Sequence, residues 1–351
     1  MPAVLRLLAL AAAAAVCAPL LTGSASAAPP TATTARPNTH TITVGSNPYD
    51  VAVAQNLGKA FVVNDGSVSV ISLITRRHLG TFGTGGYHGQ NSIALVRSNA
   101  QAYITNNLRN DVTVVDTETH RVTRHIPVGY GAVDVVKANT PNGQRAYVLT
   151  NQPAAPPQKG HNELVAIDTR TGKVVKRTPL PNFAYTMAVG PASKSIWVGS
   201  NYDGSIWQVR TATGKITKTL KPTQSGPVTG IAFTPGQKRA WIAGLGGVTV
   251  VDTKTGKTGK FLTAPKIFGG FPALGSIALN SSGRYAFAQN SVSKGPGYTS
   301  QIAAINTKTF KISWRVNTGS RSEGFSLDKT RGTAYVADYD DDTVTYFPVP
   351  K

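Results

Sequence analysis

The chain has 351 residues, of which 40% are hydrophobic, and its 36 Lys and Arg against 16 Asp and Glu give a net charge of +20 at pH 7. Beyond residue 27 no stretch approaches the roughly 20 apolar residues of a membrane span, so we expect a soluble chain. The only cysteine, Cys17, lies in the N-terminal leader, which excludes a disulfide scaffold and leaves stability to a large core. The basic excess favours anionic partners such as wall polymers, nucleic acid, acidic lipids or acidic proteins, although it also serves solubility alone.

Residues 1–27 have the three parts of a secretory signal peptide: Arg6, an apolar stretch at 7–21 and a small-residue cleavage site at 25–27. They predict a secreted, extracellular protein that begins near Ala28 and carries a net charge of +19 once Arg6 is removed. Residues 28–39 are rich in Pro, Thr and Ala and predict a flexible leader. From residue 40 to residue 351 we expect a single domain and a monomer.

Seven copies of a short strand motif run through residues 40–351, and each begins with an aromatic residue. Their first residues are 42, 44, 50, 44, 44 and 50 positions apart, close to the period of propeller blades. A small apolar strand precedes each copy, and an alternating strand and a basic strand follow most of them, which predicts four strands per unit. No segment has capped helical periodicity over ten residues. We therefore predict an all-β, seven-bladed β-propeller with four-stranded blades, whose motifs begin at Phe61, Tyr103, Tyr147, Trp197, Trp241, Tyr285 and Tyr335.

The two ends of the repeat array are complementary. The seventh unit stops after its third strand, at residues 342–349, while residues 40–44 (HTITV) form an orphan strand ahead of the first unit. Pairing of these two segments would close the ring and remove its last open sheet edges.

The motifs at 47–53 (NPYDVAV), 103–106 (YITN) and 250–256 (VVDTKTG) resemble the YVTN β-propeller repeat, and the match covers residues 40–351. The resemblance implies a propeller like those of exported bacterial and surface-layer proteins of the YncE-like kind. More distantly, in size, export and fold alone, the chain is similar to secreted actinomycete propellers of the dispase autolysis-inducing type. The matching residues build blades, so the resemblance implies a fold and not a function.

The connections between blades and those between second and third strands open on one side of a propeller, which we call the mouth face. Nearly all length variation falls there, at residues 84–91, 151–163, 264–275 and 290–300. Long loops on a rigid scaffold are where binding usually occurs, so we predict the binding site on the mouth face.

The starts of the innermost strands should meet at the mouth of the central channel. We expect Asp50, Asp134 and Glu323 to face the axis together with Asn91. Three carboxylates and an amide would suit Ca²⁺, as in metal-dependent lactonases and related propeller hydrolases. Alternatively, the carboxylates accept hydrogen bonds from backbone amides and line a wet channel, which is the interpretation we favour. The starts in register are Asp50, Ser92, Asp134, Thr186, Gly230, Ser276 and Gly324, preceded by Tyr49, Asn91, Val133, Tyr185, Thr229, Gly275 and Glu323.

Aromatic residues near the mouth face offer stacking surfaces for a sugar, a base or a peptide, although propeller aromatics also pack between blades. His88 is the one histidine we consider as a base or ligand, because the six histidines show no zinc-ligand spacing. No thiol or Gly-x-Ser-x-Gly nucleophile is present in residues 28–351. The candidate binding aromatics are Tyr49, Tyr87, Tyr185, Phe268, Phe271 and Tyr298.

Three functions remain open. The first is a secreted, non-catalytic scaffold that binds an extracellular protein or polyanion on the mouth face, with unspecific binding of nucleic acid as one form of the latter. The second is a metal-dependent lactonase-type hydrolase with Asp50, Asp134 and Glu323 as metal ligands. The third, implied by the distant resemblance, is a modulator of a secreted protease that is also a transglutaminase substrate, with Gln152, Gln158 and Lys159 as crosslinking sites.

Overall fold

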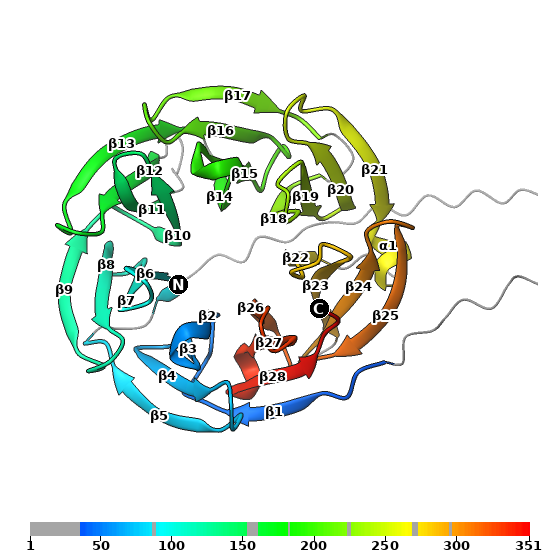
Figure 1. Ribbon diagram of the computed structural model, residues 1–351, viewed down its shortest axis with the longest axis horizontal. Helices are drawn as coiled ribbons and strands as arrows, with labels where there is room; N and C mark the ends of the chain where they lie inside the picture. The colour runs from blue at the N-terminus through cyan, green and yellow to red at the C-terminus, as the bar shows by residue number, and fades with distance from the viewer. Residues whose placement is uncertain are drawn as a thin grey trace, which may run out of the picture. The chain divides into compact units, whose positions relative to one another are not determined.

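A computed structural model describes residues 36–85, 89–152, 161–181, 183–222, 226–268, 273–294 and 297–351. Residues Thr34–Lys351 form one compact unit. Within it, seven four-stranded antiparallel sheets surround a central axis, as Figure 1 shows. The predicted seven-bladed β-propeller is therefore confirmed.

Each blade runs from an inner strand at the axis to an outer strand on the rim (Figure 1). Blade 1 consists of β2 (Asp50–Ala54), β3 (Lys59–Asn64), β4 (Ser67–Ser72) and β5 (His78–Gly83). Blade 2 consists of β6 (Gln90–Val96), β7 (Gln101–Asn106), β8 (Asp111–Asp116) and β9 (Val122–Pro127). Blade 3 consists of β10 (Ala132–Thr140), β11 (Gly143–Gln152), β12 (His161–Asp168) and β13 (Val174–Leu180). Blade 4 consists of β14 (Ala184–Val189), β15 (Ser195–Ser200), β16 (Ile206–Arg210) and β17 (Ile216–Leu220). Blade 5 consists of β18 (Val228–Phe233), β19 (Arg239–Gly244), β20 (Gly247–Asp252) and β21 (Thr258–Thr263). Blade 6 consists of β22 (Ala273–Leu279), β23 (Tyr285–Lys294), β24 (Gly297–Asn306) and β25 (Lys311–Asn317). Blade 7 consists of β26 (Ser322–Asp328), β27 (Thr333–Asp338), β28 (Thr343–Pro348) and β1 (His40–Thr43).

The core is divided among the interfaces between blades. Seven clusters of buried apolar side chains each join two neighbouring blades, and the aromatic that begins each repeat motif lies in one of them or packs against it. Phe61, Trp197 and Tyr335, for example, are at most 1% exposed. The aromatic at the start of each motif is thus the side chain that packs one blade against the next.

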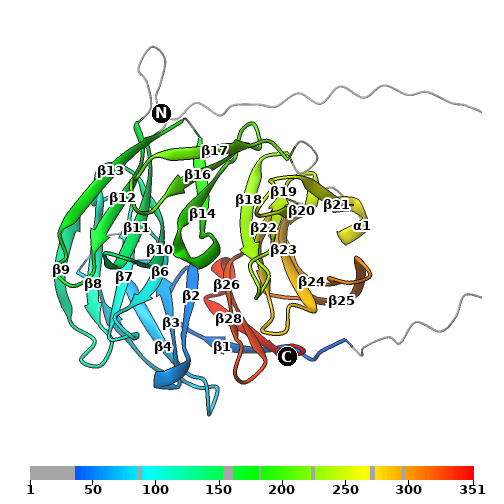
Figure 2. The ribbon, with the colours of Figure 1, turned by 45° about the horizontal axis from the view of Figure 1, so that its top comes forward.

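The ring closes through β1 and β28. Their antiparallel register runs from His40 opposite Tyr346 to Thr43 opposite Thr343, and Figure 2 shows β1 beside β28 at the rim. Ile42 is buried in the cluster that joins blade 7 to blade 1. The predicted closure is confirmed: β1 begins at the predicted residue and ends one residue early, and β28 lies one residue inside its predicted segment at each end.

Two connections on the mouth face differ from the loops expected there. Residues 264–268 form a short helix, α1 (Ala264–Phe268), because Ala264 and Ile267 bury against the core between blades 5 and 6. The segment at 290–300 continues the β23–β24 hairpin, with ladder pairing as far as Lys294 opposite Gly297. Elsewhere η1 (Gln55–Leu57), η2 (Pro191–Ser193) and η3 (Tyr339–Asp341) are single 3₁₀ turns. Within the described ranges, no helix is long and apolar enough to cross a membrane.

Candidate functional site

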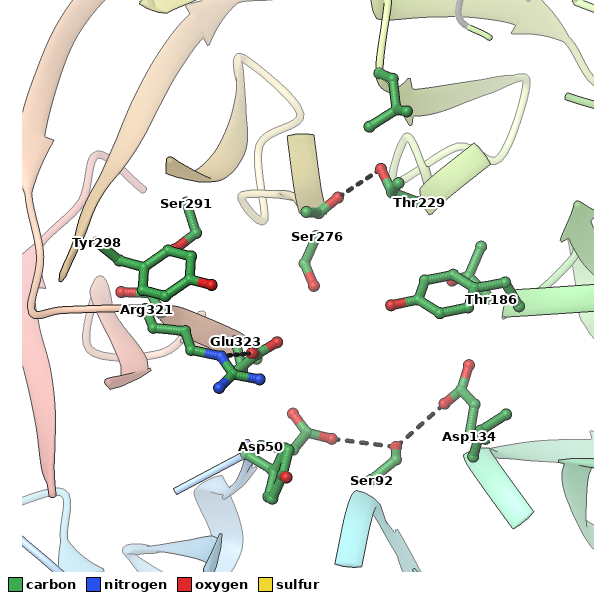
Figure 3. Close-up of a pocket in the computed structure, with 17 residues that line it drawn as sticks. Asp50, Ser92, Asp134, Thr186, Thr229, Ser276, Ser291, Tyr298, Arg321 and Glu323 are labelled. Carbon is green, nitrogen blue, oxygen red and sulfur yellow. Dashed lines mark hydrogen bonds and ion pairs between the residues drawn. The ribbon is translucent and has the colours of Figure 1, made fainter. Parts of the chain in front are cut away.

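A cavity of about 600 Å³ opens on the mouth face at the centre of the ring. Its wall is built from the starts of the inner strands, because the four-stranded repeat brings those positions to one level around the axis (Figure 3). The described side chains that line it are mostly hydroxyls, tyrosines and carboxylates. The lining includes Tyr49, Asp50, Ser92, Val133, Asp134, Tyr185, Thr186, Thr229, Gly275, Ser276, Glu323 and Gly324, which the sequence places in register, and also Leu245, Ser291, Tyr298, Arg321 and Ser322.

Asp50, Ser92 and Asp134, on blades 1, 2 and 3, form a chain along one side of the cavity (Figure 3). The Ser92 hydroxyl lies 3.1 Å from Asp50 Oδ2 and 3.1 Å from Asp134 Oδ1. Asp50 also accepts the N–H groups of Val51 and Ile93, and Asp134 accepts that of Met187. The two carboxylates therefore connect neighbouring blades through backbone donors, in agreement with the second of the two sequence interpretations.

The electrostatics of this chain follow from its burial. Desolvation raises the pKa of Asp50 to about 7 and that of Asp134 to about 6, although backbone donors and Ser92 act in the opposite direction. The negative charge of Asp134 further raises the pKa of Asp50. A hydroxyl has one proton to donate, so Ser92 cannot serve both ionised carboxylates fully at one time. Near neutral pH the two acids therefore compete for a donor.

Glu323 lies on another side of the cavity and has a basic partner. Arg321 Nε donates to its Oε1 over 2.9 Å (Figure 3). The guanidinium carbon of Arg321 stands 4.2 Å from the ring centre of Tyr339 and 5.9 Å from that of Tyr298. Burial raises the pKa of Glu323, and the charge of Arg321 partly offsets this. This side of the cavity is thus a guanidinium held by one carboxylate and two aromatic faces.

Two further tyrosines border the opening. Tyr49 packs edge-on against Tyr339 with ring centres 4.8 Å apart, and burial raises its pKa. Tyr185 is 48% exposed, and its pKa is raised by burial and by the negative charges of Glu323 and Asp134. Both rings are placed where a ligand entering the cavity would meet them.

The metal hypothesis gains no geometric support. Across the described part of the chain, no three His, Cys, Asp or Glu side chains are grouped so that they could hold an ion, and this includes Asp50, Asp134 and Glu323. In the acidic segment at 338–342, Asp338 is fully buried and accepts hydrogen bonds from Ser322 and Thr345. The carboxylate of Asp338 therefore joins strands and loops of blade 7.

The remaining predicted site residues lie away from the cavity or outside the residues that the structure describes in full. Phe268 packs against the core between blades 5 and 6 and does not line the cavity. Only the backbones of Asn91 and Gln152 are described. The other predicted residues lie outside the described residues: Tyr87, His88, Phe271, Gln158 and Lys159.

The sequence analysis missed three residues beside this cavity. Arg321 stands two positions before Glu323, which was the only signal for it, and Tyr339 was hidden in the acidic segment. Gln289, on β23, is 1% exposed, and neither polar atom of its amide has a hydrogen-bond partner among the described residues. Its Oε1 would lie 3.5 Å from a Cβ added to the cavity residue Gly275.

Exposed aromatic side chains share the mouth face with the cavity, and two of them, Tyr185 and Tyr298, line it. Among the described residues, every exposed Tyr or Phe belongs to a connection or strand end of the mouth face. Phe183 and Tyr202 stack with ring centres 4.7 Å apart, and Phe183 is held at φ 67°, a conformation that bulky residues rarely adopt. The five residues are Tyr130, Phe183, Tyr185, Tyr202 and Tyr298.

Comparison with known proteins supports the fold. Hydrazine synthase of Kuenenia stuttgartiensis is similar at 17% identity, with a TM-score of 0.74 over 86% of this chain and 96% of that one. The Cps50 (Swd1) β-propeller domain of Myceliophteria thermophila is similar at 12% identity, with a TM-score of 0.71 over 89% of this chain and 100% of that domain. No protein-family model and no curated protein matches the sequence. The chain is therefore a seven-bladed β-propeller, and its YVTN and dispase autolysis-inducing resemblances stay predictions.

Proposed function

We propose that the chain is a secreted, non-catalytic binding protein that engages an extracellular macromolecule on its mouth face. The observation that carries the proposal is that the exposed aromatics of the described chain all lie on the face where the cavity opens, and that Tyr185 and Tyr298 line it. Exposed aromatic side chains on a rigid scaffold are typical anchors of protein interfaces. A protein partner therefore fits the mouth face better than a polyanion, which would meet the basic outer strands of the rim.

The lactonase-type alternative has no observation in its favour. Asp50, Asp134 and Glu323 are not grouped so that they could hold a metal ion, and Glu323 is paired with Arg321. A hydrolase site needs groups poised toward a substrate in addition to a cavity.

The test is capture of a partner from culture supernatant and cell-wall fractions on the immobilised protein. We expect a retained partner whose binding is lost in a double variant, Tyr202→Ser with Leu245→Ser, because both side chains are exposed on the mouth face. The matched control is Ile74→Ser with Leu79→Ser, since Ile74 is 73% exposed on the opposite face and Tyr202 is 70% exposed.

The salt dependence of capture distinguishes a protein partner from a polyanion. Capture that survives 0.5 M salt and fails only in the Tyr202 variant supports a protein on the mouth face. Capture abolished by salt and unaffected by that variant would instead indicate polyanion binding to the rim. No capture at low or high salt would contradict the proposal.

A further inference from the structure

We propose that the cavity of the mouth face binds an organic cation, an ammonium or guanidinium group on a slender alkyl arm, on the side formed by Asp50, Ser92, Asp134 and Tyr185. The inference rests on the proposed function, because it names the chemistry that the mouth face would recognise. The group could belong to a lysine or arginine side chain of a protein partner or to a free polyamine.

The first argument is that two partly buried carboxylates lack a basic partner among the described residues. The ion pairs among described residues involve Asp111, Asp168, Glu163, Asp203, Glu323 and Asp328, but neither Asp50 nor Asp134. Buried charges are normally paired, since desolvation is costly otherwise. In a chain with 36 Lys and Arg, two unpaired acids on a cavity wall indicate that the compensating charge comes from a ligand.

The second argument is a count of donors. Ser92 is shared between Asp50 Oδ2 and Asp134 Oδ1 at 3.1 Å each, and it has one proton. An ammonium supplies three N–H donors and a guanidinium up to five. A cation beside this pair would add donors to those that the backbone and Ser92 already supply, and it would add the missing positive charge.

The third argument is that the cavity already holds one cation of this kind. Arg321 is bound between Glu323 and the faces of Tyr339 and Tyr298. Across the cavity from Arg321, Asp134 (Figure 3) and Tyr185 offer the same combination of carboxylate and aromatic ring, and the negative charge of Asp134 raises the pKa of Tyr185. Among the described residues no Lys or Arg pairs with this second arrangement.

An independent observation points to a polar ligand in the same cavity. The amide of Gln289 is 99% buried directly behind Gly275 of the wall, and neither its Nε2 nor its Oε1 has a partner within the described chain. Buried amides are almost always hydrogen-bonded, so the wall behind Gly275 holds a polar group with unused hydrogen-bonding capacity, although Gln289 does not itself line the cavity. The cavity volume of about 600 Å³ is that of a small-molecule or side-chain site and far exceeds a metal ion.

The test is calorimetric titration of the purified full-length protein at pH 7.5 with 1,5-diaminopentane, using the neutral isostere 1,5-pentanediol as the control ligand. A blocked glycine-rich peptide with one central lysine, against the same peptide with norleucine, separates a protein-borne cation from a free amine. We expect saturable one-to-one binding of the diamine or the lysine peptide and none of the diol or the norleucine peptide.

Variants locate the site. Asp134→Asn keeps the shape of the side chain and should weaken cation binding at least tenfold. Tyr185→Leu, at a half-exposed position, should weaken it several-fold with an unchanged melting temperature. Asp252→Asn is the control, because Asp252 caps an exposed turn on the opposite face and an amide caps that turn too.

Three outcomes would overturn the inference: no cation binds, the diol binds as well as the diamine, or Asp134→Asn retains full affinity. Binding of CaCl₂ that depends on Asp134 and excludes the diamine would also overturn it in favour of a metal. Partner capture that persists while the diamine fails to bind would contradict this inference alone. Diamine binding without partner capture would contradict the proposed function alone.

Discussion

Ser92 determines how the inner wall of the cavity is held together. The alignment of inner strands predicted that Asp50, Ser92 and Asp134 would stand side by side, because a repeat of fixed strand number places equivalent residues at one level. It could not predict that one hydroxyl would lie 3.1 Å from both carboxylates, since that depends on side-chain rotamers. Arg321 was missed for a similar reason, because its φ of 47° turns it toward Tyr339 only in the folded loop.

The carboxylic acids at the cavity have raised pKa values in the folded protein, so the free energy of unfolding depends on pH. In the folded state the pKa of Asp134 is about 6, above its ordinary 3.8, so the folded state binds a proton more tightly than the unfolded state. The stability this contributes is present below pH 4 and is lost as pH rises through 6. Asp50 and Asp338 act in the same direction, while Arg321 beside Glu323 stays charged throughout.

Asp134→Asn should remove the Asp134 part of this dependence. Its amide can accept the Met187 N–H and donate to Ser92, which then serves Asp50 alone. We expect the stability of the variant relative to wild type to rise by about 1–2 kcal/mol between pH 5 and pH 8. Urea unfolding of the variant and the wild type at both pH values measures this change. A stability difference between them that is the same at pH 5 and pH 8 would contradict the raised pKa of Asp134.

Gly324 is required where blade 7 meets blade 1. Its N–H donates to the carbonyl of Tyr49 at 2.8 Å, and an added Cβ would stand 2.5 Å from Asp50 Oδ1 and 2.8 Å from the Tyr49 carbonyl. Gly324→Ala should therefore cost about 1–3 kcal/mol, because backbone must move. Gly236→Ala, where nothing lies within 4 Å, is the control, and equal melting temperatures for the two variants would show the contact to be absent.

At the scale of strands, part of the basic excess has a structural role. Arg124 on β9 donates to the carbonyl of Thr171 in the next blade at 2.6 Å, and Lys218 on β17 donates to that of Thr255 at 2.8 Å. Lys260 on β21 lies over the ring of Phe310, again in the next blade. Outer-strand cations thus connect successive blades, in addition to the protection that such charges on an outer strand generally give to a sheet edge.

These contacts should be weak and additive. Lys218→Met keeps the aliphatic stem and removes the donor, so we expect a loss of about 0.5–1 kcal/mol at this exposed site. Combining Arg124→Met, Lys218→Met and Lys260→Met should add the three effects, because the sites lie in different blade pairs. Lys257→Met, at an exposed lysine, is the control in thermal melts. A triple variant that melts with the wild type would show that these cations do not join blades.

Strands were predictable where a repeating constraint acts on the sequence. The aromatic that begins each second strand recurs because every blade packs against its neighbour in the same way. A turn-capping Asp recurs in blades 2, 3 and 5, as Asp116, which accepts the N–H groups of Glu118 and Thr119, illustrates. The helix α1 and the long β23–β24 hairpin occur once each. Nothing repeats to reveal them, so tertiary packing decided their form.

For the whole molecule, closure by β1 is the feature on which the ring depends. Deleting His40–Thr43 would expose the edge of β28 and remove Ile42 from the cluster between blades 7 and 1. We expect a loss above about 3 kcal/mol and association through the open edge. Ile42→Val should cost about 1 kcal/mol. Melting curves and light scattering test this, and an unchanged, monomeric deletion variant would contradict the role of β1.

The central claim is that the mouth face, with its cavity and exposed aromatics, is the binding surface. Hydrogen–deuterium exchange of the protein with and without its captured partner tests this most directly. The account predicts added protection at Phe183–Met187, at the β23–β24 hairpin and at Tyr202, with the outer strands β9, β13 and β17 unchanged. Protection confined to the outer strands, with the mouth face exchanging as in the free protein, would contradict it.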